Sequence, residues 1–235
     1  MAADMSAPLV YQKLTIRAYG DKIMRMFITM VDDMISDTSE MLCMHENLKR
    51  SPLHVYEDDG MYIITDEEAK TRGIIDLKEP VIDHWSDLHP APQSAPFITL
   101  FPDGDESKPI SLSDDHFSPP RYDALPIGYC TMDDKEERAT ISFKCSHDEC
   151  FAGTGERFYK MDLSGQTFQL KNQDGQGVNN RRCYKNIPFY LSSRMYGCFY
   201  HTSDYCKLSL ADHSTRSVQF MCDRATIDCF LIGGN

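Results

Sequence analysis

The chain of 235 residues is long enough to bury a sizeable core, either in one large domain or in two smaller ones. Hydrophobic residues make up 41% of the sequence and aromatic residues 11%, which excludes a disordered protein. The formal net charge of −12 would repel a phosphate backbone, so nucleic acid is not an expected partner.

The chain consists of short extended segments separated by turns. Two hairpins are predicted in the N-terminal part, with turns at Gly20-Asp21 and Asp58-Asp59-Gly60. Aromatic and β-branched residues are frequent in the extended segments, as is typical of strands. We expect strands at Leu9–Tyr19, Lys22–Met30, His54–Glu57, Met61–Thr65, Phe97–Phe101, Ala139–Lys144, Arg157–Asp162, Gln166–Leu170, Pro188–Leu191, Tyr196–His201, Cys206–Leu210, Ser217–Cys222 and Thr226–Ile232.

Two stretches depart from this pattern. Asp37–Lys49 could form a helix that begins at Ser39 as its capping residue. Glu79–Pro126 is rich in Pro, Asp and Ser, which predicts long irregular connections around one or two strands. It could mark a seam between two halves, but its composition is not that of a linker. The sequence therefore predicts a single all-β domain over residues 1–235, an antiparallel β-sandwich or a barrel, with little helix.

The N-terminal residues lack the positive and apolar regions of a signal peptide. No apolar run is long enough to span a bilayer, so a membrane is not an expected partner. The nine cysteines are scattered, with no C-x-x-C pair, which suits a reducing compartment. We expect a cytoplasmic protein.

The stretch richest in candidate functional residues begins with Gly153-Thr-Gly-Glu-Arg-Phe158. Its two glycines permit a tight turn or a close approach of backbones. Glu156 and Arg157 stand where a buried or interfacial ion pair is expected. The polar loop that follows contains Asn172 and Asp174, whose side chains suit either sugar hydroxyls or an ordinary hairpin turn.

Five motifs in this order resemble the family 31 glycoside hydrolases, the bacterial α-xylosidases in particular. They are G-x-G-E-R-F from Gly153, N-x-D-G from Asn172, Y-K-N-I-P-F-Y-L-S from Tyr184, R-x-Y-G-x-F from Arg194 and D-x-F-x-I-x-G from Asp228. The clear resemblance covers Gly153–Gly234.

The resemblance implies a large sandwich of the galactose-mutarotase-like kind, which precedes a (β/α)₈ barrel. In that family the barrel supplies two catalytic aspartates of a retaining mechanism. The barrel's nucleophile motif, W-x-D-M-N-E, does not occur in this sequence. The resemblance thus implies a non-catalytic domain without cofactor, partnered by the barrel of an α-xylosidase or α-glucosidase and by an α-linked sugar.

The resemblance also implies roles for single residues. The N-terminal domain of the family sends a loop to the sugar, and Asp174 occupies the matching position, with Asn172 beside it. Glu156, Arg157, Tyr184, Lys185 and Asn186 belong to the motifs at the interface or in the framework. Three residues depart from the family pattern: Lys171 where many members have Trp, Met195 where Gly is frequent, and Cys229 where an aromatic residue is usual.

Other signals are weaker. Cys145-x-His147-x-x-Cys150 lacks the fourth ligand of a zinc site, and no metal is expected. A free-standing carbohydrate-binding or interaction module is an alternative. An aldose 1-epimerase is a further one, but it needs a His acid and a carboxylate base facing each other, and the sequence pairs none.

Overall fold

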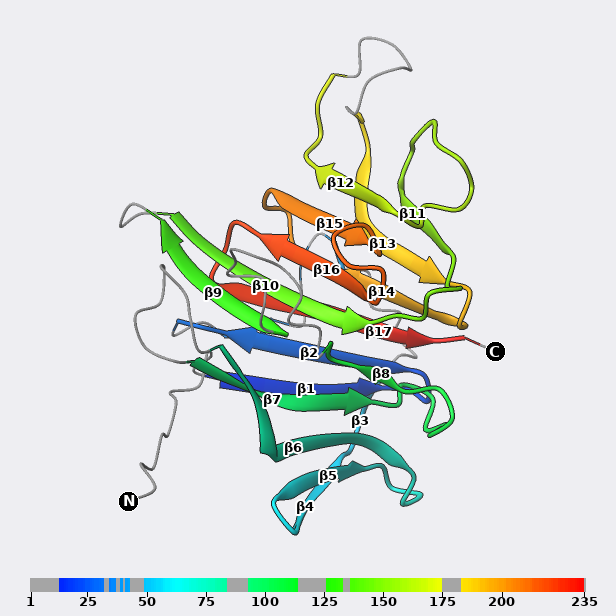
Figure 1. The fold of residues 1–235 in the computed structure, drawn as a ribbon. Coiled ribbons are helices and arrows are strands. Elements are labelled where there is room, and N and C mark those ends of the chain that lie inside the picture. Colours follow the sequence, from blue (N-terminus) through cyan, green and yellow to red (C-terminus); the bar gives the residue numbers. More distant parts are fainter. Residues whose placement is uncertain are drawn as a thin grey trace.

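The structure is a computed structural model that describes residues 13–31, 34–36, 39, 41–42, 49–83, 93–113, 126–132, 136–174 and 183–234. Within these ranges all regular elements are strands, and they form three antiparallel sheets (Figure 1). This confirms the all-β sandwich class. The described residues contain no helix with the length and apolar character that crossing a bilayer requires.

The largest sheet has seven strands in the order β11-β13-β14-β17-β2-β1-β3. It joins the first hairpin of the chain to its last strand, because β17 pairs with β2 along seven residues. Its strands are β1 (Lys13–Tyr19), β2 (Ile23–Thr29), β3 (Arg50–Ser51), β11 (Phe151–Gly155), β13 (Asn186–Ser192), β14 (Tyr196–Tyr200) and β17 (Thr226–Gly233).

A second sheet with the order β12-β15-β16-β10-β9 shares its core with the first sheet. Tyr200 of the first sheet stacks on Phe220 of the second, with ring centroids 3.6 Å apart and planes within 3°. Met24, Met26 and Ile141 are completely buried in the same core. The strands are β9 (Ile127–Met132), β10 (Glu136–Lys144), β12 (Gln166–Leu170), β15 (Cys206–Leu210) and β16 (Ser217–Cys222).

The third sheet has the order β4-β5-β6-β7-β8. Ile98, Leu100 and Ile110 connect it to the common core, whereas every residue of its edge strand β4 is exposed. In Figure 1 it lies at the opposite end of the molecule from β11 and β12. The strands are β4 (His54–Asp58), β5 (Met61–Thr65), β6 (Thr71–Asp83), β7 (Gln93–Leu100) and β8 (Ile110–Ser111).

Both predicted hairpins are present. Gly20, with φ of +56°, turns the chain from β1 to β2. Asp59 and Gly60, with φ of +47° and +79°, join β4 to β5 as a two-residue loop. A positive φ at both positions is the requirement of the hairpin turn that Asp-Gly favours.

The structure corrects the predicted strand at Arg157–Asp162. These residues form an irregular loop, and β12 pairs with β15. The loop carries two strongly exposed apolar side chains, Phe158 and Met161, so its apolar residues do not mark a buried strand. The strand lies just before this loop, as β11. Its composition did not predict a strand, because it contains two glycines and glycine is uncommon in strands.

The predicted helix at 37–49 is also not seen in the described residues of that stretch. Ser39 and Leu42 form an isolated bridge, and Ser39 Oγ accepts a hydrogen bond from the Met41 amide at 3.2 Å. These contacts form a short turn around Ser39. Residues 37, 38, 40 and 43–48 lie outside the described ranges. The described part of 79–126 contains the end of β6 together with β7 and β8, which is more strand than its composition indicates.

Candidate functional site

The two glycines of the first family motif allow β11 to approach β13 closely. Gly153 has φ of +122°, and a Cβ atom on it would lie 2.6 Å from the Phe189 carbonyl oxygen. Gly155 has φ of +98°, and a Cβ atom there would collide with the Lys185 carbonyl oxygen. The pairing of β11 with β13 is shifted between these glycines. These contacts confirm that the close approach of the two backbones is the reason for a glycine at each position.

The Glu156-Arg157 pair is divided between two partners. Glu156 bonds to Lys185 with 3.4 Å between Oε1 and Nζ, and both side chains are largely exposed. Arg157 turns inward, where its guanidinium lies 4.8 Å from the centre of the Phe168 ring and donates to the Asn186 side-chain oxygen. Burial lowers the pKa of Arg157. The two neighbours do not form the single ion pair that the sequence suggested. Glu156 contacts Lys185, which directly precedes β13, and Arg157 contacts Asn186, the first residue of β13.

Asn186 and Asn172 close the base of the loop that contains the predicted substrate residues. The backbone amide and the side-chain amide of Asn186 donate to Asn172 Oδ1 at 2.8 and 3.0 Å. A parallel bridge joins Asn172 to Cys183, and the Gln173 amide donates to the Cys183 carbonyl at 3.0 Å. The side-chain oxygen of Asn172 thus holds the two ends of the loop together.

Asp174 is exposed and lies two residues beyond this closure. It is the last described residue before the segment 175–182, of which the structure describes nothing. The structure thus places Asn172 in the closure of the loop and Asp174 beyond it, and both residues are exposed.

Exposed apolar side chains surround this framework. The amide of Glu156 donates to the Lys185 carbonyl at 3.1 Å and so joins the loop after β11 to the start of β13. These two segments carry what we call the apolar rim, and Figure 1 shows them at one end of the molecule. The rim comprises Phe158 (81% exposed), Met161 (86%), Tyr184 (65%), Tyr159 (42%) and Ile187 (40%).

A cavity of about 470 Å³ lies beside the closure of the loop. Asn172 and Asn186 line one part of it, and Asp204 and Tyr205 line another part. Its mixture of amide, carboxylate and phenol groups can form hydrogen bonds with a polar ligand.

A second cluster was not predicted from the sequence. Arg25 binds Asp228 with two contacts of 2.6 and 2.7 Å, and Asp228 also lies 2.8 Å from Nδ1 of His201. Ser39 Oγ lies 2.6 Å from the other ring nitrogen of His201. Burial alone would raise the pKa of Asp228, but hydrogen bonds from Arg25 and His201 outweigh it and keep the pKa below its ordinary value.

This cluster resembles a Ser-His-Asp chain, but the carboxylate is already neutralised by a buried guanidinium. His201 and Asp228 are in direct contact, so they leave no space between them for the sugar of an epimerase. We therefore interpret the cluster as part of the framework. His201 and Asp228 are 27 residues apart in the sequence, and only strand pairing shows that they meet.

Residues 13–208 match the model of the glycosyl hydrolase 31 N-terminal galactose mutarotase-like domain. The chain belongs to this family. This match confirms the resemblance to family 31 that the five motifs indicated.

Two curated relatives are similar over part of the chain. The α-xylosidase XylQ of Lactiplantibacillus pentosus is 37% identical over 87 residues, which are 37% of this chain and 11% of the relative. An α-xylosidase of Emericella nidulans is 37% identical over 82 residues, which are 35% of this chain and 10% of the relative. The chain is thus matched to a small part of much longer enzymes.

Solved structures agree in fold. A family 31 dextranase of Flavobacterium johnsoniae has a TM-score of 0.65 and 16% identity, covering 98% of this chain and 27% of its own. The cycloalternan-forming enzyme of Listeria monocytogenes has a TM-score of 0.68 and 17% identity, covering 98% of this chain and 19% of its own. The fold is therefore that of the N-terminal domain in multidomain enzymes of family 31, in which the catalytic barrel lies elsewhere in the chain.

Proposed function

We propose that this domain acts without catalytic groups of its own, by docking on the barrel of an α-xylosidase or α-glucosidase and placing the Asp174 loop at the sugar. The observation that carries the proposal is the apolar rim. Phe158 and Met161 are more than four-fifths exposed although both are large and apolar. An exposed apolar patch of this kind is typical of a surface that another domain covers.

The position of the rim supports the second half of the proposal. Glu156, Arg157 and Lys185 fasten the rim segments to β13, and Asn186 fastens the closure of the Asp174 loop to the same strand. A domain that covers the rim would therefore bring its own surface close to Asp174. A carboxylate at that place can accept hydrogen bonds from sugar hydroxyls.

A chimera tests the docking. This chain would replace the corresponding domain of the Lactiplantibacillus pentosus α-xylosidase, and hydrolysis of an aryl α-xyloside would be measured. We expect activity in the chimera and a large loss with Phe158→Ser combined with Met161→Ser. Leu77→Ser is the matched control, because Leu77 is an exposed apolar residue of β6 outside the rim. Equal activity of the double variant and the control would contradict the proposal.

A free-standing carbohydrate-binding module is a second candidate, and the cavity lined by Asn172, Asn186 and Tyr205 is the observation that favours it. It predicts that the isolated chain binds xylose or glucose, with loss of binding in Tyr205→Ala. Docking through the rim predicts no measurable sugar binding by the isolated chain. Calorimetric titration of the chain with each sugar separates the two.

We also propose a reducing, cytoplasmic location. Seven cysteines whose side chains the structure describes are free thiols. Cys206 and Cys222 are direct neighbours on β15 and β16, and burial raises the pKa of each to about 12, which keeps both thiols protonated. Denatured protein isolated without reductant should react with close to nine equivalents of a thiol reagent, one for each cysteine of the chain. Complete labelling only after reduction would contradict this location.

A further inference from the structure

Two cysteines of the second sheet stand directly opposite each other on neighbouring strands. Cys206 of β15 pairs with Cys222 of β16 in the antiparallel register. Directly paired residues point their side chains to the same face of a sheet, and here that face belongs to the common core. Both residues carry free thiols. The two sulfur atoms are therefore neighbours on one face of the second sheet.

The hydrogen bonds beside the two cysteines show that the backbones come close at this position. The Asp223 amide donates to the Tyr205 carbonyl at 3.0 Å, so the adjoining cysteines form a pair of the non-hydrogen-bonded kind. Cα atoms in such a pair are about 4.5 Å apart, closer than in a hydrogen-bonded pair. A disulfide needs Cα atoms about 4.4–6.8 Å apart. The strand pair thus permits a disulfide between Cys206 and Cys222 without movement of the backbone.

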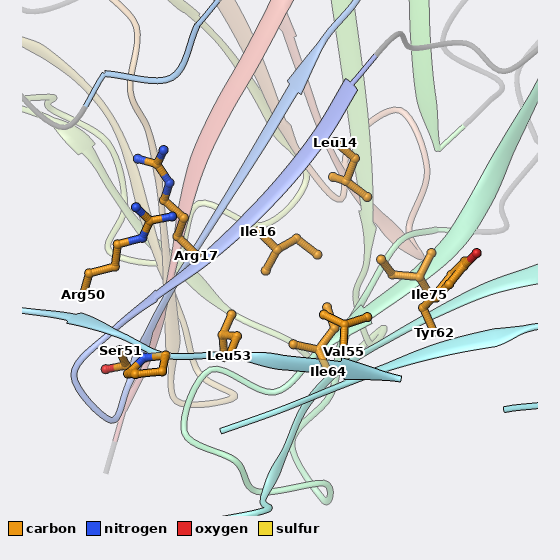
Figure 2. Close-up of a pocket in the computed structure, with 11 residues that line it drawn as sticks. Leu14, Ile16, Arg17, Arg50, Ser51, Leu53, Val55, Tyr62, Ile64 and Ile75 are labelled. Atoms are coloured by element: carbon orange, nitrogen blue, oxygen red, sulfur yellow. The ribbon is translucent and has the colours of Figure 1, made fainter. Parts of the chain in front are cut away.

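A small molecule can reach one of the two thiols through a cavity. A groove of about 610 Å³ lies between β1 and the third sheet, and Figure 2 shows aliphatic side chains along it, among them Leu14, Ile16 and Val55. The described residues that line this groove include no cysteine. Cys206, in contrast, lines the cavity of about 470 Å³ beside Asn172. A small polar oxidant in that cavity would lie against the Cys206 side chain.

We propose that Cys206 and Cys222 form a redox-sensitive pair, which hydrogen peroxide converts into a disulfide and a small thiol converts back. The site goes beyond docking on a barrel and does not depend on it. In a reducing compartment the pair is a dithiol, and the disulfide forms only while peroxide is present. Transient disulfides of this kind in reducing compartments serve redox sensing.

The oxidation requires peroxide as its oxidant. The Cys206 thiolate attacks one oxygen of peroxide, the O–O bond breaks, hydroxide leaves and a sulfenic acid forms. The Cys222 sulfur then attacks the Cys206 sulfur, the S–S bond forms and the S–O bond breaks. The thiol protons end in water, so both thiols are oxidised and the peroxide is reduced to water. Burial raises the pKa of both thiols to about 12, so the thiolate is rare at neutral pH and its attack is slow.

The disulfide fastens the part of the sheet that leads to the Asp174 loop. β15 lies between β16 and the edge strand β12, and Cys206 pairs on its other side with Leu170, the last residue of β12. Lys171 and Asn172 follow Leu170 directly. A bond from β15 to β16 therefore limits opening of the sheet at the base of this loop, and it also constrains the unfolded chain.

Peptide mapping of the whole chain tests the pair. The folded chain is treated with hydrogen peroxide, its remaining thiols are blocked, and the protease fragments are identified by mass. We expect two fragments joined through Cys206 and Cys222, which dithiothreitol separates. The linked chain should melt about 5 °C or more above the reduced chain, because the bond closes a loop of the unfolded chain. Cys206→Ala and Cys222→Ala should show neither the joined fragments nor the rise.

The chain contains a matched control pair of cysteines. Cys198 of β14 and Cys229 of β17 are completely buried, but they are diagonal neighbours, because Cys198 pairs with Leu231 and Cys229 pairs with Tyr200. Diagonal Cα atoms lie about 7–8 Å apart, which is too far for a disulfide. The control pair should therefore stay reduced under the same treatment.

The exposed Cys150 thiol shows when the treatment is complete, so peroxide is raised until this residue is oxidised. The proposal is overturned if Cys206 and Cys222 are then still thiols, if the control pair becomes linked as readily, or if the linked chain melts no higher than the reduced chain. These outcomes are measured on the parent chain, so they hold even if the alanine variants do not fold.

Discussion

The centre of the sandwich and its periphery differ in which side chains they bury and which they expose. In the centre, around β2, β14 and β17, even charged groups are buried: Arg25 is 1% exposed and is bound to Asp228. At the periphery, apolar groups are exposed: Phe158 and Met161 in the rim, and Val55 on the edge strand β4. The buried charges of the centre are paired within the chain, whereas the periphery has surfaces that suit contacts with other molecules.

This difference in burial predicts which substitutions should change stability and which should change binding. A buried group has lost its water, so removal of its partner is costly. An exposed group keeps its water in both the folded and the unfolded state, so its removal changes stability little. Substitutions in the centre should therefore lower the free energy of unfolding, and those at the periphery should lower affinity for a partner.

The largest effect is expected for Asp228→Ala. The substitution leaves the Arg25 guanidinium buried without its carboxylate and also removes the partner of His201. We expect a loss of about 3–5 kcal/mol in the free energy of unfolding, measured with urea at neutral pH. Asp223→Ala is the control, because its ion pair with Arg138 is partly exposed and should be worth about 1 kcal/mol or less. Equal losses in the two variants would contradict the contrast between centre and periphery.

The same carboxylate predicts a dependence on pH. The pKa of Asp228 is lowered in the folded protein, so the folded state binds its proton less readily than the unfolded state does. Its contribution to stability is complete above the ordinary carboxyl pKa of about 4 and is lost as the pH falls through the lower, folded value. Between neutral pH and about pH 3, Asp228→Asn should lose less stability than the parent chain does.

A somewhat smaller effect is expected for Gly155→Ala. The new Cβ atom would meet the Lys185 backbone, which cannot rotate away as a side chain could, at a φ of +98°. We expect a loss of about 3 kcal/mol. Gly165→Ala is the matched control, because Gly165 also has a positive φ, +71°, but has no atom within 4 Å of the added group. Its loss of about 1 kcal/mol would measure the backbone conformation alone.

Met195→Gly should raise stability. Met195 has φ of +64° in the turn between β13 and β14, where its half-exposed side chain gains little from burial. Relief of the left-handed conformation outweighs the greater chain entropy of glycine, with a net gain of roughly 0.5–1 kcal/mol. Arg194→Gly in the same turn lacks that relief and should lower the melting temperature. A lower melting temperature for Met195→Gly as well would show that the methionine side chain stabilises the turn.

The smallest effect on stability is expected for Asp174→Ala. The side chain is exposed, so the melting temperature of the isolated chain should not change measurably. In the chimera with the α-xylosidase barrel, kcat/KM should fall about tenfold or more, since a charged hydrogen bond to the sugar is lost. Earlier unfolding of the isolated chain together with full efficiency of the chimera would assign Asp174 to the turn.

Most strands could be predicted from the sequence because their signals are local. The segments Met61–Thr65, Gln166–Leu170, Cys206–Leu210 and Ser217–Cys222 were predicted with the bounds that the structure has. Three of them contain β-branched and aromatic residues, which are typical of strands, whereas Cys206–Leu210 contains neither. The prediction failed for Arg157–Asp162, where apolar residues are exposed, and for β11, where glycines allow two strands to approach closely.

The sequence alone determined the fold class, the hairpin turns and the family, because strand patterns, positive-φ turn residues and ordered motifs are all read from neighbouring residues. Tertiary structure alone decided which side chains meet. Asn172 bonds to Asn186 across 14 positions, Arg25 bonds to Asp228 across 203, and Tyr19 pairs with Arg50. Such contacts depend on strand order and register in the sheets. These follow from the burial of the whole core and not from any local pattern.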